Sequence, residues 1–333
     1  MRILSGIQPS GNLHLGNYFG MMKPMLERQK SSELFCFIVN YHALTTSRES
    51  ALLAGRTLEA AVDFLSLGLD PEKCVFWVQL DMPEVTELTW VLSNVTGMGL
   101  LERCHSYKDK LANGIKPNHG LFAYPVLMAA DILIMQADVI PVGADQKQHV
   151  EVAQDIAERF NSAYGQAFKV PQPEIQAGGR MITGTDGRKM SKSYDNTIDI
   201  FCDRETLRKK IAGFKTDSAP AGEGIRDASE NALFQLYSGF LDDTGRTSLK
   251  KRFESPGLKY SEVKPELADH IWNYFEPYRR IREELVRDRE RVLRILKKGA
   301  DKARAAAEPT MRDVRRRVGL DYAGMVLSVS DKR

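Results

Sequence analysis

The sequence predicts an α/β fold with a doubly wound parallel sheet, followed by an all-helical second domain. Three observations support this prediction. Short apolar runs alternate with helical periodicity in the first half, only helical periodicity follows residue 203, and a glycine-rich basic stretch at 178–196 separates the two regions. Strands that alternate with helices are typical of a parallel sheet covered on both faces, which binds ligands beyond the carboxyl ends of its strands. We expect an α/β domain at 1–194 and a helical domain at 195–333, with packing of the terminal helix back on the α/β domain as one arrangement.

Apolar runs and helical spacing define the expected elements of the α/β domain. Four buried strands are expected at 2–7, 33–39, 74–79 and 138–142. Between and after them, helical segments are expected at 15–29, 49–69, 83–104, 121–136 and 145–162. Pro24 is expected to kink the first of these helices, and Gly68 to end the second. Each strand is therefore followed by a helical crossover, as parallel pairing requires.

The helical domain contains no run with β-periodicity. Its helices are expected at 203–213, 228–240, 246–254, 262–297 and 299–317. Residues 279–317 hold 15 Lys and Arg against 7 Asp and Glu, whereas the formal net charge of the whole chain is only +3. This local excess of positive charge favours either a polyanionic partner or a solvated helix face with ion pairs four residues apart.

The cysteines and the most apolar stretch exclude several classes of protein. Cys36, Cys74, Cys104 and Cys202 are far apart and form no C-x-x-C pair, which favours reduced thiols in a cytoplasmic protein, without a structural metal or an iron–sulfur cluster. Residues 121–142 are strongly apolar, but two aspartates interrupt them, and a carboxylate is costly in a bilayer. We therefore expect a buried helix and strand there, and no association with a membrane.

The stretch "SGIQPSGNLHLGNYFG" at 5–20 joins the first strand to the first helix. It matches neither the dinucleotide fingerprint nor the P-loop pattern. A helix start attracts anions, His14 and Asn17 would share one face of its first turn, and Gly16 would let a ligand approach the backbone. These features predict a site for a phosphate. The alternative is a glycine-rich turn with a surface histidine.

The stretch "GRKMSKS" at 187–193 carries two lysines, Lys189 and Lys192, on a loop with Gly184 and Gly187 as hinges. Two ammonium groups on such a loop can clamp a polyphosphate and follow its charge as a leaving group departs. The alternative is a solvated basic loop. The combination with the first motif favours the phosphate site.

The two motifs together resemble a known signature pair. "HLGN" followed by "KMSKS" looks like the signature of class I aminoacyl-tRNA synthetases. The order of "GIQPSG", "AYPVLMAADIL", "VIPVGADQKQHVE", "RKMSKS" and "KTDS" resembles the blocks of bacterial tryptophanyl-tRNA synthetases. The resemblance extends over about residues 3 to 320, and it implies a Rossmann-like class I catalytic domain.

The resemblance assigns the nucleotide site. His14 would lie at the ATP phosphates, and the lysines at 110, 189 and 192 would act on them. It implies a catalytic group of His14, Asn17, Lys110, Lys189 and Lys192. It implies ATP binding by Gln8, Pro9, Ser10, Gly16, Asn17, Gly143, Ala144, Asp145, Met181, Lys189, Met190, Ser191, Lys192 and Ser193.

The resemblance also assigns the tryptophan pocket. Asp131 would accept a hydrogen bond from the indole N–H, Tyr124 and Gln146 would contact the α-amino group, and Met128 would line the ring. Leu4 and His42 would complete the pocket, although the family often has Phe where Leu4 stands. Asn40 and Tyr41 are two further departures, because the family usually has an acidic residue and Gln or Leu there.

Elementary chemistry agrees with the assignment of Asp131. A carboxylate on the apolar helix "LMAADILIM" needs a hydrogen-bond donor, and the indole N–H is a donor only. A site that depends on this bond rejects phenylalanine, which leaves the acceptor unpaired. The alternatives are an aspartate on the helix surface and a buried structural ion pair.

The implied reaction has two steps. L-Tryptophan and ATP form tryptophanyl-adenylate and pyrophosphate, and tryptophan then passes to the terminal adenosine of tRNA(Trp). ATP would bring Mg²⁺, held mostly by its phosphates. The helical domain would read the anticodon, and a homodimer is implied. Three alternatives remain: a tyrosyl-tRNA synthetase, a small-molecule adenylyltransferase, and an RNA-binding or regulatory paralogue without activity.

Overall fold

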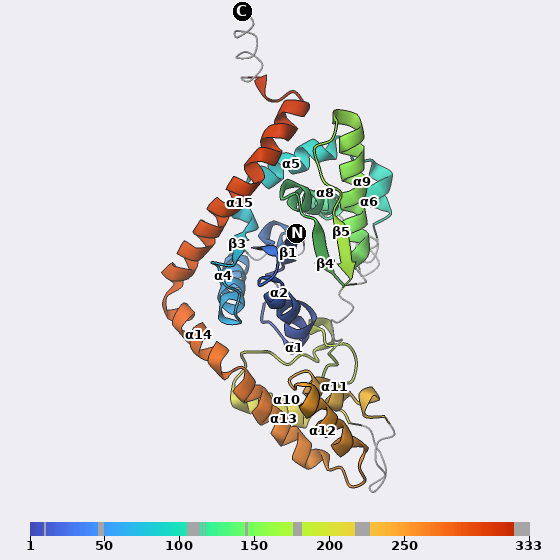
Figure 1. The fold of residues 1–333 in the computed structure, drawn as a ribbon, viewed down its shortest axis with the longest axis vertical. Coiled ribbons are helices and arrows are strands. Elements are labelled where there is room, and N and C mark those ends of the chain that lie inside the picture. The colour runs from blue at the N-terminus through green and yellow to red at the C-terminus, as the bar shows by residue number, and fades with distance from the viewer. Residues whose placement is uncertain are drawn as a thin grey trace, which may run out of the picture.

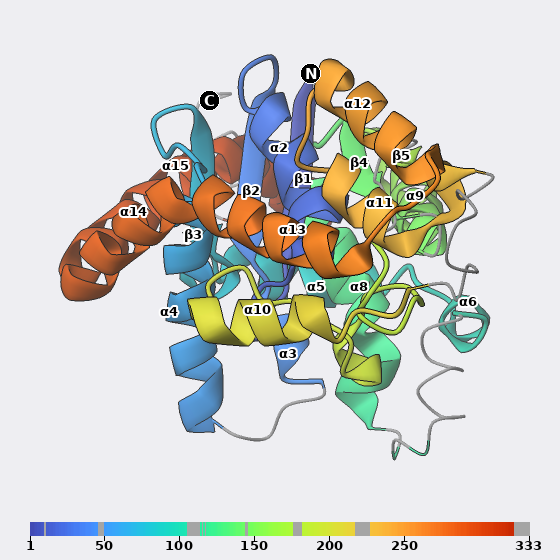
Figure 2. The same ribbon diagram turned by 90° about the horizontal axis from the view of Figure 1, so that it is seen from below.

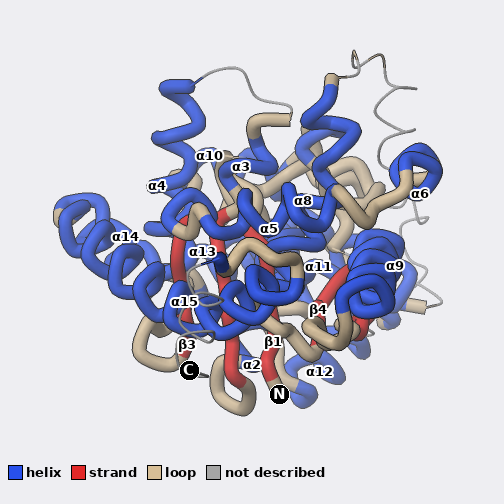
Figure 3. Tube along the Cα trace, turned by 90° about the horizontal axis from the view of Figure 1, so that it is seen from above, coloured by secondary structure: helices blue, strands red, loops and turns tan. Residues whose placement is uncertain are grey.

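The computed structural model describes residues 1–9, 11–45, 50–104, 114, 116, 118–143, 146–175, 182–216 and 227–322. The sheet has five parallel strands in the order β3-β2-β1-β4-β5. They are β1 (Arg2–Ile7), β2 (Glu33–Ile38), β3 (Cys74–Val78), β4 (Val139–Val142) and β5 (Gln172–Ile175). The predicted α/β class with a parallel sheet is confirmed. Figure 3 shows the strands in the middle of this part of the molecule, surrounded by helices.

The strand β5 was not predicted from the sequence. Its residues "QPEI" are half-exposed or exposed and include Pro173. A short polar strand of this kind is possible because β5 pairs with β4 alone, at the edge of the sheet, where a missing N–H is tolerated.

The order of the strands reverses between β1 and β4. From β1 the chain proceeds through β2 to β3 on one side, and β4 and β5 are then added on the other side. Such a switch point leaves a crevice beyond the carboxyl ends of the two central strands.

Successive residues of each strand point to opposite faces of the sheet. Ile3 and Phe76 belong to one buried cluster, and their neighbours Leu4 and Trp77 belong to another. The first cluster includes side chains of α4 (Ser50–Ser66), and the second includes those of α5 (Glu84–Ser93), α6 (Met98–Glu102), α8 (His119–Ile134) and α9 (Lys147–Tyr164). In the part of the chain that the structure describes, no helix is long and apolar enough to span a membrane.

The predicted helix at 15–29 consists of three pieces. They are α1 (Leu15–Asn17), the π-helical turn η1 (Tyr18–Met22) and α2 (Lys23–Arg28). Pro24 lies in the first turn of α2, where a missing N–H costs little. Two short helical turns follow the neighbouring strands: α3 (Asn40–Ala43) after β2, and the 3₁₀ turn η2 (Gln79–Asp81) after β3.

The described elements after residue 200 are all helical, and those at 204–274 lie at the lower end of the molecule in Figure 1. It contains α10 (Arg204–Ala212), the 3₁₀ turn η5 (Ala228–Glu230), α11 (Ala232–Ser238), α12 (Asp243–Glu254) and α13 (Tyr260–Tyr274). Figure 2 shows α10 and α13 lying side by side, and the two helices are in contact.

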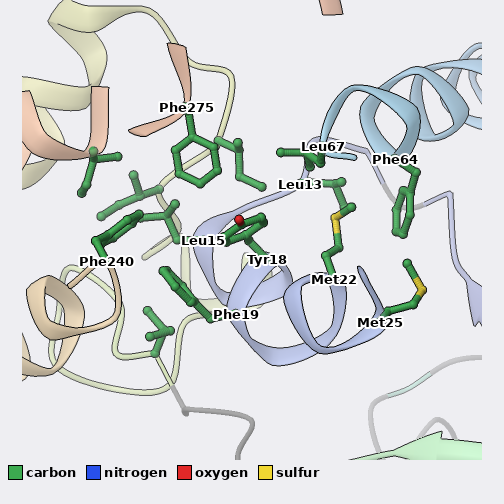
Figure 4. Close-up of a cluster of buried hydrophobic side chains, with 14 of the residues drawn as sticks. Leu13, Leu15, Tyr18, Phe19, Met22, Met25, Phe64, Leu67, Phe240 and Phe275 are labelled. Atoms are coloured by element: carbon green, nitrogen blue, oxygen red, sulfur yellow. The ribbon is translucent and has the colours of Figure 1, made fainter. Parts of the chain in front are cut away.

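An aromatic cluster joins the first helical turns to this lower part (Figure 4). Phe19 contacts Phe240 edge to face with ring centroids 4.8 Å apart, and Tyr18 contacts Phe275 in the same way at 5.0 Å. The Tyr18 and Tyr274 hydroxyls are 2.8 Å apart, within hydrogen-bond distance. The segment that leaves β1 therefore packs directly on the helices of the second half.

The predicted helix boundaries at 262–297 and 299–317 are wrong. The chain forms three helices there, α13, α14 (Glu276–Arg287) and α15 (Arg289–Arg317), and breaks at Phe275 and Asp288. The Asp288 side chain caps α15 by accepting a hydrogen bond from the Arg291 N–H at 2.9 Å.

Gly299 lies inside α15 because the helix touches the sheet there. A Cβ at this position would lie 1.7 Å from the carbonyl oxygen of Phe76 in β3. Figure 1 shows α15 running past β3 along one side of the molecule. Val292 and Leu296 join the first buried cluster, and Ala303 and Met311 join the second. The glycine thus permits close packing within one continuous helix, where we expected a break at residue 298.

Candidate active site

A cavity of about 950 Å³ lies at the carboxyl ends of the central strands, beside the switch point. β1 and the loop after it supply one wall, and α8 and the residues after β4 supply the opposite wall. The residues predicted from the sequence that line this cavity are Leu4, Gln8, Pro9, Gly16, Asn17, His42, Tyr124, Met128, Asp131, Gly143, Gln146 and Lys189.

Other predicted residues are absent from the cavity wall or are not described. His14 and Met190 are buried next to Gly16, and Lys192 approaches Gly11 from the second motif. The Ser191 backbone N–H donates to a neighbouring side chain. Ser10, Lys110, Ala144, Asp145, Met181 and the side chain of Ser193 lie outside the described residues.

His14 and Asn17 form a reciprocal cap at the start of α1. The Asn17 N–H donates to His14 Nδ1 at 3.3 Å, and the His14 N–H donates to Asn17 Oδ1 at 3.1 Å. Burial, together with the positive charge of Lys192, lowers the pKa of His14 to about 4. The ring is therefore neutral at pH 7. Because Nδ1 accepts a hydrogen bond, the ring proton must be on Nε2, which makes His14 a neutral donor.

The second motif lies against this helix start. The Gly16 N–H donates to Met190 Sδ at 3.3 Å. A Cβ on Gly16 would lie 2.9 Å from His14 Nδ1 and 3.3 Å from Met190 Cβ, so only glycine fits between the two motifs. The Leu15 N–H donates to the Ile198 carbonyl at 2.9 Å, which ties the chain after the second motif to the first motif.

Asn196 holds the second motif in shape, and no pattern in the sequence indicated this role. Its side chain is buried. Oδ1 accepts from the Ser191 N–H at 2.7 Å, and Nδ2 donates to Asp186 Oδ1 at 2.7 Å and to the Lys189 carbonyl at 3.1 Å. Gly184 is required beside it, because a Cβ there would lie 2.3 Å from the amide of Asn196. One amide thus fixes the backbone on both sides of the lysines.

Lys192 of the second motif is partly buried and lies near two carboxylates. Burial lowers its pKa, and the negative charges of Asp199 and Asp63 oppose this effect. Asp63 is itself buried on α4, where Arg282 of α14 donates to it at 2.7 Å. The second motif therefore lies where α4, α14 and the loop after β1 come together.

Asp131 is the buried acid of the cavity, with 3% of its surface exposed. His42 Nε2 lies 2.8 Å from its Oδ2, and Gln79 Nε2 lies 2.8 Å from both carboxylate oxygens. Burial raises the pKa of Asp131, and the hydrogen bonds from His42 and Gln79 oppose that rise. The carboxylate thus has protein partners, as the ion-pair alternative expected, yet it still lines the cavity.

Gln79 was missed because its position after an apolar strand carries no motif. Its carboxylate partner is 52 residues further along the chain, so only the fold brings the two together. A second pair on the cavity wall joins Tyr124 and His149, whose Oη and Nε2 atoms are 3.1 Å apart.

The described residues contain no group of three or more His, Cys, Asp or Glu side chains arranged to hold a metal ion. Cys36, Cys74, Cys104 and Cys202 are free thiols, and the first three are buried. The polar groups of the cavity wall thus include Lys189, the start of α1 and the buried Asp131 carboxylate, and the neutral imidazole of His14 lies next to Gly16 of that wall. This set can neutralise an anion at one end and hold a single hydrogen-bond donor at the other.

Comparison with known proteins agrees with this geometry. The sequence profile of the tRNA synthetases class I (W and Y) matches residues 1–276. The tryptophan–tRNA ligase of Campylobacter jejuni is 48% identical over 320 residues, which are 96% of this chain and 100% of that protein. The tryptophan–tRNA ligase of Rhodopirellula baltica is 46% identical over the same shares of the two chains. The crystal structure of the Campylobacter jejuni enzyme complexed with ADP and tryptophan has a TM-score of 0.90 and 47% identity, covering 96% of this chain and 100% of the other.

Proposed function

This chain belongs to the class I tRNA synthetases of the tryptophan and tyrosine type, and from that premise we propose how its cavity activates tryptophan. Its activity is that of a tryptophan–tRNA ligase. Identity of 46–48% to tryptophan–tRNA ligases over nearly the whole chain favours this activity over the tyrosine alternative. The observation that carries the proposal is the buried Asp131 carboxylate on the wall of the cavity.

Tryptophan binds at the α8 end of the cavity in this proposal. The indole N–H donates to the Asp131 carboxylate, and Met128 and Leu4 cover the ring. Tyr124 and Gln146 accept hydrogen bonds from the α-amino group. The side chain of phenylalanine has no N–H group. Phenylalanine would therefore leave the buried Asp131 carboxylate without the hydrogen bond that the indole donates.

ATP binds at the opposite end, between the two motifs. Gln8, Pro9, Gly16 and Asn17 hold it from the loop after β1, and Gly143 contacts the nucleoside. Lys189 and Lys192 contact the phosphates from the second motif, with Met190, Ser191 and Ser193. The same roles are proposed for Ser10, Lys110, Ala144, Asp145 and Met181. ATP enters as its Mg²⁺ complex, in which phosphate oxygens hold most of the ion.

Activation is an in-line displacement at the α-phosphorus. A carboxylate oxygen of tryptophan forms the new P–O bond, and the bond to the bridging oxygen of pyrophosphate breaks. Negative charge then grows on the phosphate oxygens and on the departing pyrophosphate. The neutral His14 donates from Nε2 to a phosphate oxygen, and the two lysines of the second motif stabilise the leaving group. A hydroxyl of the terminal adenosine of tRNA(Trp) then attacks the carbonyl carbon of the adenylate, the bond from that carbon to the phosphate oxygen breaks, and AMP leaves.

The partners are proposed from the same premise. The catalytic domain spans 1–194, and the helical domain 195–333 would contact the anticodon of tRNA through exposed basic side chains. Some of the arginines are engaged within the protein, since Arg282 pairs with Glu59 and Asp63 and Arg315 pairs with Glu87. We also propose a homodimer in the cytoplasm. Trp90 on α5, with 74% of its surface accessible, is an exposed apolar side chain that supports a protein–protein interface.

Amino-acid-dependent ATP–pyrophosphate exchange tests the function. Each of the twenty amino acids is supplied separately with ATP and labelled pyrophosphate. Tryptophan alone should support exchange. Exchange that depends on tyrosine, or no exchange with any amino acid, would refute the proposal.

A further inference from the structure

We infer that Asn40 and Gln79 are positioning residues that set the tryptophan specificity of the cavity by holding the Asp131 carboxylate and the His42 ring. The inference rests on the proposed function of this cavity. It concerns two short turns, α3 and η2, that follow the neighbouring parallel strands β2 and β3. Ile38 and Val78, near the ends of these strands, are paired in register, so the two turns leave the sheet side by side.

The two turns are joined by a reciprocal pair of hydrogen bonds. The Tyr41 N–H of α3 donates to Gln79 Oε1 at 3.0 Å, and the Leu80 N–H of η2 donates to Asn40 Oδ1 at 3.2 Å. In each case a side chain from one turn satisfies a backbone N–H at the start of the other. Such N–H groups have no partner within their own helix. Each turn therefore depends on the other for its position.

This pairing fixes the orientation of the Gln79 amide. A backbone N–H can only donate, so Oε1 must face Tyr41 and Nε2 must face the opposite way. Nε2 then lies 2.8 Å from both oxygens of Asp131. Gln79 is 1% exposed, so water cannot replace this contact. The carboxylate is held by a donor whose direction is set by the backbone of α3.

The second partner of Asp131 comes from the same unit. His42 follows Tyr41 in α3, and its Nε2 lies 2.8 Å from Asp131 Oδ2. Among the described residues, Oδ1 has Gln79 as its hydrogen-bond partner, which leaves a lone pair of this oxygen available to a ligand. Asn40 and Gln79 together thus decide where both donors lie and which part of the carboxylate remains for the indole.

The donors also favour the ionised form of Asp131. Burial favours the protonated form of a carboxyl group, and hydrogen bonds to the charged form oppose this. Loss of the Gln79 donor would raise the pKa of Asp131 further. The other titratable side chains on the cavity wall are His42, Tyr124, His149, Lys189 and Arg56. None of these side chains is replaced in the variants below.

The first test compares Gln79→Leu with the wild type in ATP–pyrophosphate exchange. The Michaelis constants for tryptophan and ATP are measured from pH 5.5 to 9, and 1-methyltryptophan, which lacks the indole N–H, serves as the probe of that bond. The variant should raise the KM for tryptophan by about ten-fold or more and change the KM for ATP less than about two-fold. It should prefer tryptophan over 1-methyltryptophan less strongly. Its KM for tryptophan should fall as pH rises, because the carboxylate then ionises.

The second test uses Asn40, which does not touch Asp131 and whose replacement leaves Gln79 in place. Asn40→Leu removes the acceptor for Leu80, whereas Asn40→Asp keeps an acceptor oxygen at the same position. Asn40→Leu should raise the KM for tryptophan and Asn40→Asp should retain most of the wild-type value. The comparison of Asn40→Leu with Asn40→Asp tests the positioning role even if Gln79→Leu does not fold.

The outcomes separate this inference from the proposed function. A wild type without tryptophan-dependent exchange refutes the function. The positioning role is refuted if the wild type shows tryptophan-dependent exchange but the variants raise the KM for tryptophan and the KM for ATP equally. In that outcome the KM for tryptophan also depends on pH as it does in the wild type. Equal effects of Asn40→Leu and Asn40→Asp also refute it.

Discussion

The side chain of His14 caps the helix that contains Asn17, and the side chain of Asn17 returns a hydrogen bond to the backbone N–H of His14. This reciprocal pair assigns the ring proton to Nε2, because Nδ1 is already an acceptor. It also explains why the first motif can have a histidine at the phosphate site, whereas a P-loop has a lysine there. The positive charges come from the second motif, and the first motif supplies a neutral donor.

The variants His14→Asn and His14→Ala separate capping from catalysis. Asparagine is a good N-cap, so His14→Asn should keep the helix start but lose the Nε2–H donor. Its kcat for tryptophan-dependent exchange should fall by about 10²–10³-fold, with little change in KM for tryptophan. His14→Ala should show the same fall in kcat and lose about 1 kcal/mol of stability in urea unfolding as well. A His14→Asn variant with wild-type kcat would exclude the donor role.

The low pKa of His14 predicts a pH-dependent stability. The folded protein holds this ring with a pKa of about 4, below the value of 6.5 for an unfolded chain. The unfolded state therefore binds the proton first, and the contribution of His14 to stability is lost as pH falls from about 6.5 to about 4. Urea unfolding from pH 4 to 8 should show the wild type losing more stability than His14→Asn across this window. A constant difference between the two proteins would contradict the assignment.

The charge of Lys192 is the second cause of this low pKa, after burial. Lys192→Gln should therefore raise the pKa of His14, as measured by NMR titration of the ring. Lys169→Gln is a matched control, because Lys169 is an exposed lysine that pairs with Asp138 at the edge of the sheet. The control should leave the His14 titration unchanged. A shift of equal size in both variants would mean that Lys192 acts only through the overall charge.

Asn196 should affect the lysines of the second motif without touching the substrates. In Asn196→Ala the Ser191 N–H and the Lys189 carbonyl lose their common partner. Single-turnover formation of the adenylate should slow by about ten-fold or more, while the Kd for tryptophan in equilibrium binding stays near the wild-type value. Equal losses in rate and in tryptophan binding would indicate general damage to the fold.

Gly299 should be essential for the packing of α15 on β3. Gly299→Ala places a Cβ against the Phe76 carbonyl and should lower the free energy of unfolding by about 2 kcal/mol or more. Gly55→Ala in α4 is the control, because a Cβ there meets no atom within 4 Å. That change should stabilise the helix by up to about 1 kcal/mol. Urea unfolding measures both, and a neutral Gly299→Ala would show that α15 can move away from the sheet without cost.

The sequence was informative where a local signal was strong. The apolar runs at 2–7 and 33–39 became β1 and β2, and the two phosphate motifs were recognisable from their residues alone. The roles of Gln79 and Asn196 could not be predicted, because each depends on contacts that only the folded chain creates. The expected break at residue 298 was wrong for the same reason, because the contact of Gly299 with Phe76 inside α15 exists only in the folded chain.

The most direct test of the account is the effect of Asp131→Ala on the two substrates of activation. The carboxylate lies on the wall of the cavity and is proposed to accept the indole N–H. The variant should raise the KM for tryptophan by about 100-fold or more, and it should change the KM for ATP by no more than a few-fold. If both constants rise equally, Asp131 has only a structural role, and the proposed recognition of tryptophan is wrong.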